Sequence, residues 1–225
     1  MNAFVVGITG RVGSLLADRL KDCGDTVRGL VRHDRDHARF DAASIHAHLG
    51  DLGSMTPREV ASAGTGADVI VFAAGSNSGA RGVTEAIDRA GVVKTIEAAN
   101  LAGIRRFALV SVPPEAWCER GLSADEEFYF AAKKEADVVL SHNDLDWLIV
   151  RPSLLTDEPG TGRIALGPAE LHGQISRHDV AATLTALLGE PRVNRPILGL
   201  NEESGLINAA ISKYVHSYVG PSRKL

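Results

Sequence analysis

Residues 3–13 read Ala-Phe-Val-Val-Gly-Ile-Thr-Gly-Arg-Val-Gly, and the expected fold class of the 225-residue chain follows from this stretch. Residues 3–8 form a short apolar run, which predicts a buried strand. From Val12 onward apolar residues recur at helical spacing, and Cys23-Gly24 closes that segment. A strand followed at once by a glycine-rich turn and a helix predicts the first unit of a doubly wound α/β fold.

The chain continues this alternation of strands and helices. Helical spacing predicts helices at residues 83–102 and 125–140. Residues 67–74 form the clearest strand, because a nearly continuous apolar run is typical of a strand buried on both faces. Strands that alternate with helices predict parallel strands joined by right-handed crossovers. Further strands are predicted at residues 26–32, 44–49, 106–112 and 147–150.

The pattern becomes less regular after residue 152. Residues 161–174 are rich in glycine and predict an irregular segment or a short hairpin. A helix at 177–188, a strand at 196–200 and a helix at 206–218 complete the chain, and they are too few for a second core. We therefore expect residues 1–225 to form a single domain, with about residues 153–225 contributing a small cap on the substrate side.

Composition limits the function classes. A formal charge of −4 gives no reason to expect a nucleic-acid or membrane-surface partner. No apolar run approaches the roughly 20 residues that cross a bilayer, and the N-terminus has no secretory pattern. Cys23 and Cys118 make no disulfide framework, and no set of ligands converges with the histidines, so no metal is expected. These features predict a cytoplasmic monomer or homodimer that acts on a small-molecule substrate.

The three glycines of the turn have distinct physical uses. Gly7 permits a tight turn, Gly10 lets the backbone approach a pyrophosphate, and Gly13 lets the helix pack closely on the strand. The free N–H groups and the dipole of the helix start favour an anion there. The alternative is a plain turn with glycines for packing. The motif predicts a dinucleotide site that includes Gly7, Thr9, Gly10, Arg11, Val12 and Gly13.

The spacing Gly-x-x-Gly-x-x-Gly resembles the signature of the short-chain dehydrogenase/reductase superfamily, in particular its atypical and extended branches. Gly50-Asp51-Leu52 resembles the adenine-contacting segment of that family, and Phe72-Ala73-Ala74-Gly75 resembles its loop beside the ribose and nicotinamide. Residues 146–153 are similar to the D-x-T-I-x-R-P segment of NmrA-like, NAD(P)-binding members, and residues 175–181 to their I-S-R-x-D-V-A helix start. The resemblance implies a Rossmann-type doubly wound parallel sheet. It also implies cofactor contacts from Asp51, Leu52, Ala73, Ala74, Gly75, Pro152, Ser153 and Leu154.

The end of the second strand bears on the choice of dinucleotide. An NAD-preferring site usually has an acidic residue there, about 20 residues after the glycine turn, and this chain has Arg32. A guanidinium at that place can clamp a 2′-phosphate, and Arg11 and Arg35 are further candidates for the same phosphate. The alternative is that Arg32 is a solvated residue at a strand end. We expect NADP(H) to be preferred over NAD(H).

A candidate catalytic group comes from three residues. Tyr129 and Lys133 are four apart and so lie on one face of a helix, and Ser111 ends the preceding strand. An ammonium beside a phenol lowers the pKa of the phenol, so Tyr129 can exchange a proton while Ser111 holds the substrate oxygen. In the family that the chain resembles, this trio does that work and the lysine also binds the nicotinamide ribose. The alternative is that Tyr129 belongs to an aromatic cluster that only packs.

These observations predict an NADP(H)-dependent oxidoreductase that reduces a small carbonyl, quinone or flavin-type acceptor. One alternative is a non-catalytic NADP(H)-binding redox sensor similar to NmrA-like regulators. A sugar-nucleotide epimerase or dehydratase ranks last, because such enzymes usually have a larger C-terminal domain than the 73 residues that follow Pro152.

Overall fold

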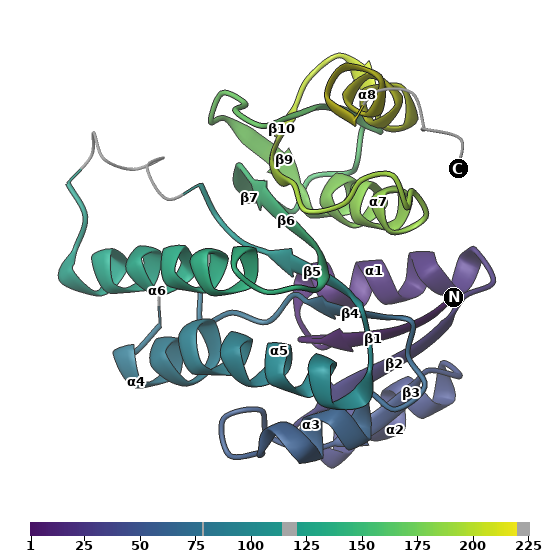
Figure 1. Cartoon of the computed structure of the whole chain (residues 1–225), viewed down its shortest axis with the longest axis vertical. Helices are drawn as coiled ribbons and strands as arrows, with labels where there is room; N and C mark the ends of the chain where they lie inside the picture. Colours follow the sequence, from purple (N-terminus) through teal and green to yellow (C-terminus); the bar gives the residue numbers. More distant parts are fainter. Residues whose placement is uncertain (78, 114–120, 220–225) are drawn as a thin grey trace.

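The computed structural model describes residues 1–77, 79–113 and 121–219. Its first six strands are β1 (Asn2–Val6), β2 (Thr26–Val31), β3 (His46–Leu49), β4 (Val69–Phe72), β5 (Arg106–Val110) and β6 (Asp146–Pro152). All six are parallel and lie in the order β6-β5-β4-β1-β2-β3, with Ala3 of β1 opposite both Val27 and Val69 (Figure 1). This is the strand order of a doubly wound Rossmann sheet, as predicted.

The C-terminal strands extend the same sheet. β10 (Ile197–Glu202) pairs parallel with β6, β8 (Arg163–Gly167) pairs antiparallel with β10, and β11 (Gly205–Leu206) pairs with β8. A second, two-stranded sheet joins β7 (Leu154–Thr156) to β9 (Gln174–Ser176). The prediction of an irregular segment or hairpin at 161–174 was therefore wrong for β8. The strand is short, and its pairing with a strand more than thirty residues away leaves no local signal.

Helices cover both faces of the sheet (Figure 1). Alternate residues of β1 divide the core, with Ala3 and Val5 on one face and Phe4 and Val6 on the other. The first face packs against α1 (Arg11–Asp22), α2 (Asp34–Ala42), α7 (Arg177–Leu188) and α8 (Ile207–Tyr214). The second packs against α3 (Pro57–Ala63), the π-turn η1 (Glu85–Arg89), α5 (Ala90–Ala102) and α6 (Ala124–Ser141), and the short α4 (Arg81–Thr84) lies against η1 and α6.

Several predicted elements have different bounds in the structure. The helix expected at 83–102 is interrupted by η1, and the one expected at 206–218 is α8 followed by the π-turn η3 (Val215–Val219). Helices α2 and α3 were not predicted. In α2 only Phe40 is buried, so the helix has almost no apolar periodicity. In α3 the capping box between Thr56 and Glu59 was the signal that the sequence did contain.

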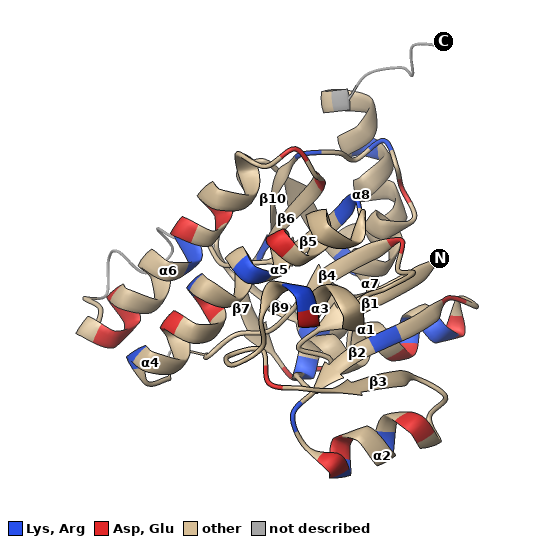
Figure 2. Cartoon of the chain, turned by 60° about the horizontal axis from the view of Figure 1, so that its bottom comes forward, with Lys and Arg blue, Asp and Glu red and all other residues tan. Residues whose placement is uncertain are grey.

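The surface carries both signs of charge. Both acidic and basic residues lie on α1, α2 and α6 in the view of Figure 2. Cys23 is free and exposed, and Cys118 lies outside the described residues. Over the described part of the chain, no helix is long and apolar enough to cross a membrane. Within those same residues, no three His, Cys, Asp or Glu side chains converge in a way that would hold a metal ion.

Candidate active site

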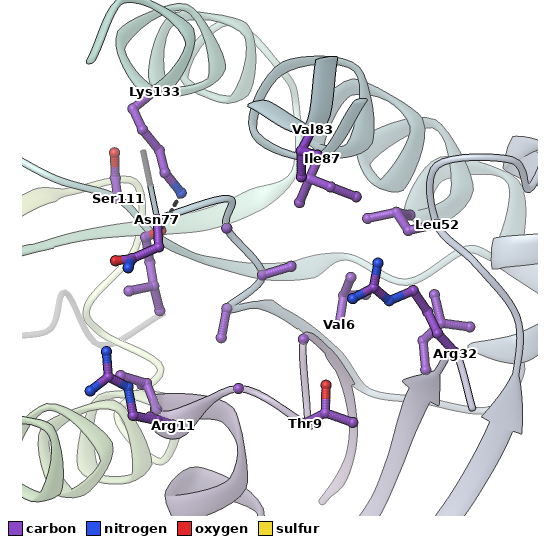
Figure 3. Close-up of a pocket in the computed structure, with 18 of the residues that line it drawn as sticks. Val6, Thr9, Arg11, Arg32, Leu52, Asn77, Val83, Ile87, Ser111 and Lys133 are labelled. Carbon is purple, nitrogen blue, oxygen red and sulfur yellow. Dashed lines mark hydrogen bonds between the residues drawn. The ribbon is translucent and has the colours of Figure 1, made fainter. Parts of the chain in front are cut away.

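A pocket of about 520 Å³ lies at the carboxyl ends of β1, β4 and β5 (Figure 3). In this sheet β1 has β2 on one side and β4 on the other, so the order of the strands reverses between β1 and β4. The pocket therefore lies at the switch point where doubly wound sheets bind ligands. Most of the side chains and backbone segments predicted from the sequence meet here. Those that line the pocket are Gly7, Thr9, Gly10, Arg11, Val12, Arg32, Asp51, Leu52, Ala73, Ala74, Gly75, Ser111, Tyr129 and Lys133.

The glycine turn forms the floor of this pocket. Gly7 has φ +89°, and a Cβ there would overlap the backbone of residues 73 and 74. Gly10 donates its N–H to the Gly7 carbonyl at 2.9 Å and is the N-cap of α1. No side chain caps this helix, so its first N–H groups are available to an anion. This arrangement fits the pyrophosphate of a dinucleotide.

The third glycine has a packing position. A Cβ at Gly13 would overlap the Gly7 carbonyl oxygen, so this residue lets α1 lie against the turn and is not among the described residues that line the pocket. Pro152, Ser153 and Leu154 do not line it either, and the neighbouring Leu155 does. The Ser153 hydroxyl is instead buried, where it accepts from the Gly173 N–H at 3.3 Å.

Arg32 lies at one end of the pocket, with its guanidinium beside Leu52 and Val6 (Figure 3). It is exposed and forms no ion pair with any residue that the structure describes. Asp51 shapes the adjacent loop, because its carboxylate accepts from the Gly53 N–H at 2.9 Å. A cation without a carboxylate partner at the end of β2 fits a phosphate group.

Lys133 enters the opposite end of the pocket and forms a buried ion pair. Its Nζ lies 2.9 Å from the Oδ1 of Asp88, and both side chains are almost inaccessible. The Ser76 N–H donates to the other carboxylate oxygen of Asp88 at 2.9 Å. Sequence reasoning missed Asp88, which sits within η1. π-turns inside helices are frequent at functional sites, but the sequence contained no local signal for Asp88, because Glu85 and Glu97 lie in the same predicted helix.

The environment of Tyr129 reverses one expectation. The Lys133 Nζ lies 5.8 Å from the centre of the Tyr129 ring, and its charge does lower the pKa of the phenol. Burial has the larger effect, however, and with the added repulsion from Asp88 the pKa of Tyr129 is raised. The phenol is therefore protonated at neutral pH and suited to donate a proton.

Ser111 is 2% exposed, and its Oγ has no well-aligned hydrogen-bond partner among the described residues. Behind it lies Asp137, which accepts from the Arg151 Nε at 2.9 Å. Burial raises the pKa of Asp137 by more than the Ser111 hydroxyl and Arg151 lower it. Ser111 lines the pocket, but its hydroxyl is buried beside Asp137, and it would have to turn from that carboxylate to reach a ligand oxygen.

Arg11 lies far from Arg32, at the other end of the pocket (Figure 3). Its Nη1 is 2.7 Å from one oxygen of Asp157, and the Nη1 of Arg177 is 2.7 Å from the other. The geometry thus separates Arg11 from the 2′-phosphate position that we expected it to share with Arg32.

Sequence reasoning also missed part of the lining. Asn77 has a positive φ of 55°, a conformation that asparagine tolerates better than most residues. Arg177 was quoted only as part of a resemblance to a helix start. Gly50 was quoted only within the segment that resembles the adenine contact, and the remaining additions are the apolar residues Val6, Leu30, Val83, Ile87, Val110, Val112 and Leu155.

The sheet order, the uncapped glycine turn and the pocket at the switch point define a Rossmann-type nucleotide-binding domain. The chain belongs to the NAD(P)H-binding family, whose model matches residues 7–191. It is 36% identical over 216 residues to the uncharacterized sugar epimerase YhfK of Bacillus subtilis, with 95% of this chain and 100% of that protein covered.

Two solved structures are also similar. One is the oxidoreductase ylbE from Lactococcus lactis, which is 27% identical with a TM-score of 0.85, over 97% of this chain and 98% of that one. The other is ChuY, an anaerobilin reductase from Escherichia coli O157:H7, which is 25% identical with a TM-score of 0.76, over 90% and 97%. The family match confirms the predicted membership of an NAD(P)H-binding family, and the two structures are consistent with the atypical short-chain dehydrogenase/reductase type that the sequence resembles.

Proposed function

We propose that this protein is an NADP(H)-dependent oxidoreductase that reduces a small carbonyl, quinone or flavin-type acceptor. The observation that carries the proposal is that Ser111, Tyr129 and Lys133 line the same pocket as the uncapped N-terminus of α1. The reductase and oxidoreductase names of the two similar structures support it.

The residues present fit the dinucleotide along the whole pocket. The first N–H groups of α1 would hold the pyrophosphate, and Arg32 the 2′-phosphate that distinguishes NADP(H). Asp51 and Leu52 would lie at the adenine end, and residues 73–75 along the ribose and nicotinamide. When bound, NADPH supplies a hydride to the acceptor.

The side chains then have separate tasks. Ser111 turns its hydroxyl from Asp137 to donate to the acceptor oxygen, and Tyr129 donates the proton that this oxygen gains on reduction. Lys133 binds the ribose hydroxyls, while Asp88 holds its ammonium in place. Because the phenol is protonated at neutral pH, the site favours reduction of a carbonyl over oxidation of an alcohol, which would need a base.

The first test is a titration of NADPH and NADH, followed by cofactor fluorescence, and then a panel of carbonyl, quinone and flavin acceptors. We expect tighter NADPH binding, loss of that preference in Arg32→Ala, and loss of NADPH oxidation in Tyr129→Phe with binding retained. Arg105→Ala is the matched control, because Arg105 precedes β5 and lies at the opposite edge of the sheet. Equal affinity for the two dinucleotides, or an unchanged rate in Tyr129→Phe, would contradict the proposal.

The same experiment separates the alternatives. Binding of NADPH with no oxidation by any acceptor would favour the redox sensor. The name of the Bacillus subtilis relative favours a test of sugar epimerisation, in which a UDP-sugar is incubated with protein loaded with NAD⁺. Epimerisation of this kind begins with removal of a hydroxyl proton, and the raised pKa of Tyr129 opposes that step.

A further inference from the structure

Three charged side chains meet beside the catalytic end of the pocket. Asp157, which follows β7, accepts from Arg11 at the start of α1 and from Arg177 at the start of α7, each at 2.7 Å. Both arginines line the pocket, as does Leu155 two residues before Asp157. Two of these three charged residues therefore come from the C-terminal segment that we expected to face the substrate.

This cluster has a net charge of +1, because two arginines share one carboxylate. Arg11 and Arg177 share the single carboxylate of Asp157, and within the described residues neither has another acidic partner. Arg177 is only 8% exposed, so its guanidinium has little access to water. Burial lowers the pKa of Arg177, and repulsion from Arg11 lowers it further, as expected where positive charge is in excess. One more negative charge would stabilise the cluster.

The proposed cofactor leaves this charge available. Arg32, at the far end of the pocket, serves the 2′-phosphate, and the first N–H groups of α1 serve the pyrophosphate. In Figure 3 Arg11 lies with Asn77, Ser111 and Lys133, away from Arg32. The surplus charge is thus at the same end of the pocket as Ser111, where the proposed acceptor would bind.

We propose that Arg11 and Arg177 bind a carboxylate or phosphate group of the acceptor, so that the substrate is an acidic compound with its reducible group at Ser111. This inference rests on the proposed function, because it concerns the same pocket. Guanidinium groups bind carboxylates and phosphates through paired hydrogen bonds, which gives both affinity and orientation. Asp157 holds the two arginines in place and competes with the incoming anion for them.

Two other roles for the cluster make different predictions. If Asp157 only clamps the ends of α1 and α7 together, its removal should not strengthen binding of an anion. If the arginines instead serve the cofactor pyrophosphate, their removal should weaken NADP⁺ binding and leave the discrimination between charged and neutral acceptors unchanged.

The test compares benzoylformate with methyl benzoylformate, which share a ketone and differ by one negative charge. Both are titrated into protein loaded with NADP⁺ and followed by ligand-observed NMR. We expect the acid to bind at least about tenfold more tightly than the ester. Arg11→Gln and Arg177→Gln should remove that preference, and Asp157→Asn should increase it severalfold. Arg192→Gln is the control, because Arg192 is an exposed arginine paired with Glu190 outside the pocket.

The inference is wrong if the wild type shows no preference for the acid, or if Asp157→Asn fails to strengthen acid binding. It is also wrong if Arg11→Gln weakens NADP⁺ without changing the preference. Arg11 and Asp157 are exposed, so their variants test the site even if Arg177→Gln does not fold. If NADP⁺ does not bind, the proposed function fails, and the same titrations repeated on protein without cofactor decide whether acid binding depends on these residues.

Discussion

The Asp88→Asn variant isolates the charge of one buried carboxylate, because asparagine has a similar shape and can still accept from the Ser76 N–H. It leaves the Lys133 ammonium without its contacting carboxylate, so that only Asp137, whose effect is weaker, opposes its charge, at a place where the Lys133 and Asp88 side chains are 4% and 0% exposed. Removing one partner of a buried ion pair costs about 3–5 kcal/mol, whereas an exposed pair contributes about 0–1 kcal/mol. We therefore expect the free energy of unfolding to fall by about 3–5 kcal/mol.

Urea unfolding at neutral pH, followed by circular dichroism, measures this loss. Asp125→Asn is the matched control, because Asp125 pairs with Arg81 at 2.7 Å but the two side chains are 60% and 54% exposed. The control should lose no more than about 1 kcal/mol. Adding Lys133→Met to Asp88→Asn removes the stranded charge and should recover most of the stability.

The pH dependence of this loss has a definite sign. Burial lowers the pKa of Lys133, but Tyr129 and Asp88 raise it by more, so the folded value lies above the ordinary 10.5. The stabilisation from the pair is then complete below the unfolded pKa and is lost as pH rises through the folded value. The difference between the wild type and Asp88→Asn should be full at neutral pH and shrink above about pH 10. A loss below about 1 kcal/mol at neutral pH would refute the reasoning that the Asp88–Lys133 pair is a buried ion pair. A double variant no more stable than Asp88→Asn would refute it as well.

Three further outcomes are expected. Gly13→Ala should prevent folding or lower thermal stability severely, because its Cβ would overlap backbone, and thermal unfolding measures this. Gly10→Ala should fold, since the nearest contact of its Cβ would be 3.1 Å, but should lose NADPH affinity in a cofactor titration. Tight NADPH binding by Gly10→Ala would contradict the pyrophosphate position. Thr56→Ala removes a capping box and should cost about 1 kcal/mol in urea unfolding; no change would show that the cap is not formed in solution. With a protonated Tyr129 as donor, NADPH oxidation should fall only above the ordinary tyrosine pKa of 10.0, and a fall near neutral pH in a rate profile would point to another group.

The sequence alone was sufficient for the fold class and for most of the residues that line the pocket at the switch point. The strand at residues 2–6, the glycine turn and α1 are contiguous, so their order is a local property that apolar periodicity reports directly. The spacing of four between Tyr129 and Lys133 placed both on one helix face, and the structure places both in the pocket with Ser111.

Elements with weak local patterns escaped prediction. Helix α2 buries a single apolar side chain, and β8 is held by its pairing with β10, so neither has a strong periodic signal of its own. The edge of a sheet depends on which distant strand pairs with it, and pairing over long sequence separation is not encoded in a short window.

The electrostatics of the site could be known only from the assembled fold. Asp88 is 45 residues from Lys133 in sequence, and the π-turn brings its carboxylate to the ammonium. Arg11 is 146 residues from Asp157, and that pairing directs Arg11 away from Arg32. Local periodicity therefore determined which backbone segments meet at the switch point. Charge partners and burial, which arise between segments far apart in the chain, decided the protonation of Tyr129 and the position of the surplus positive charge.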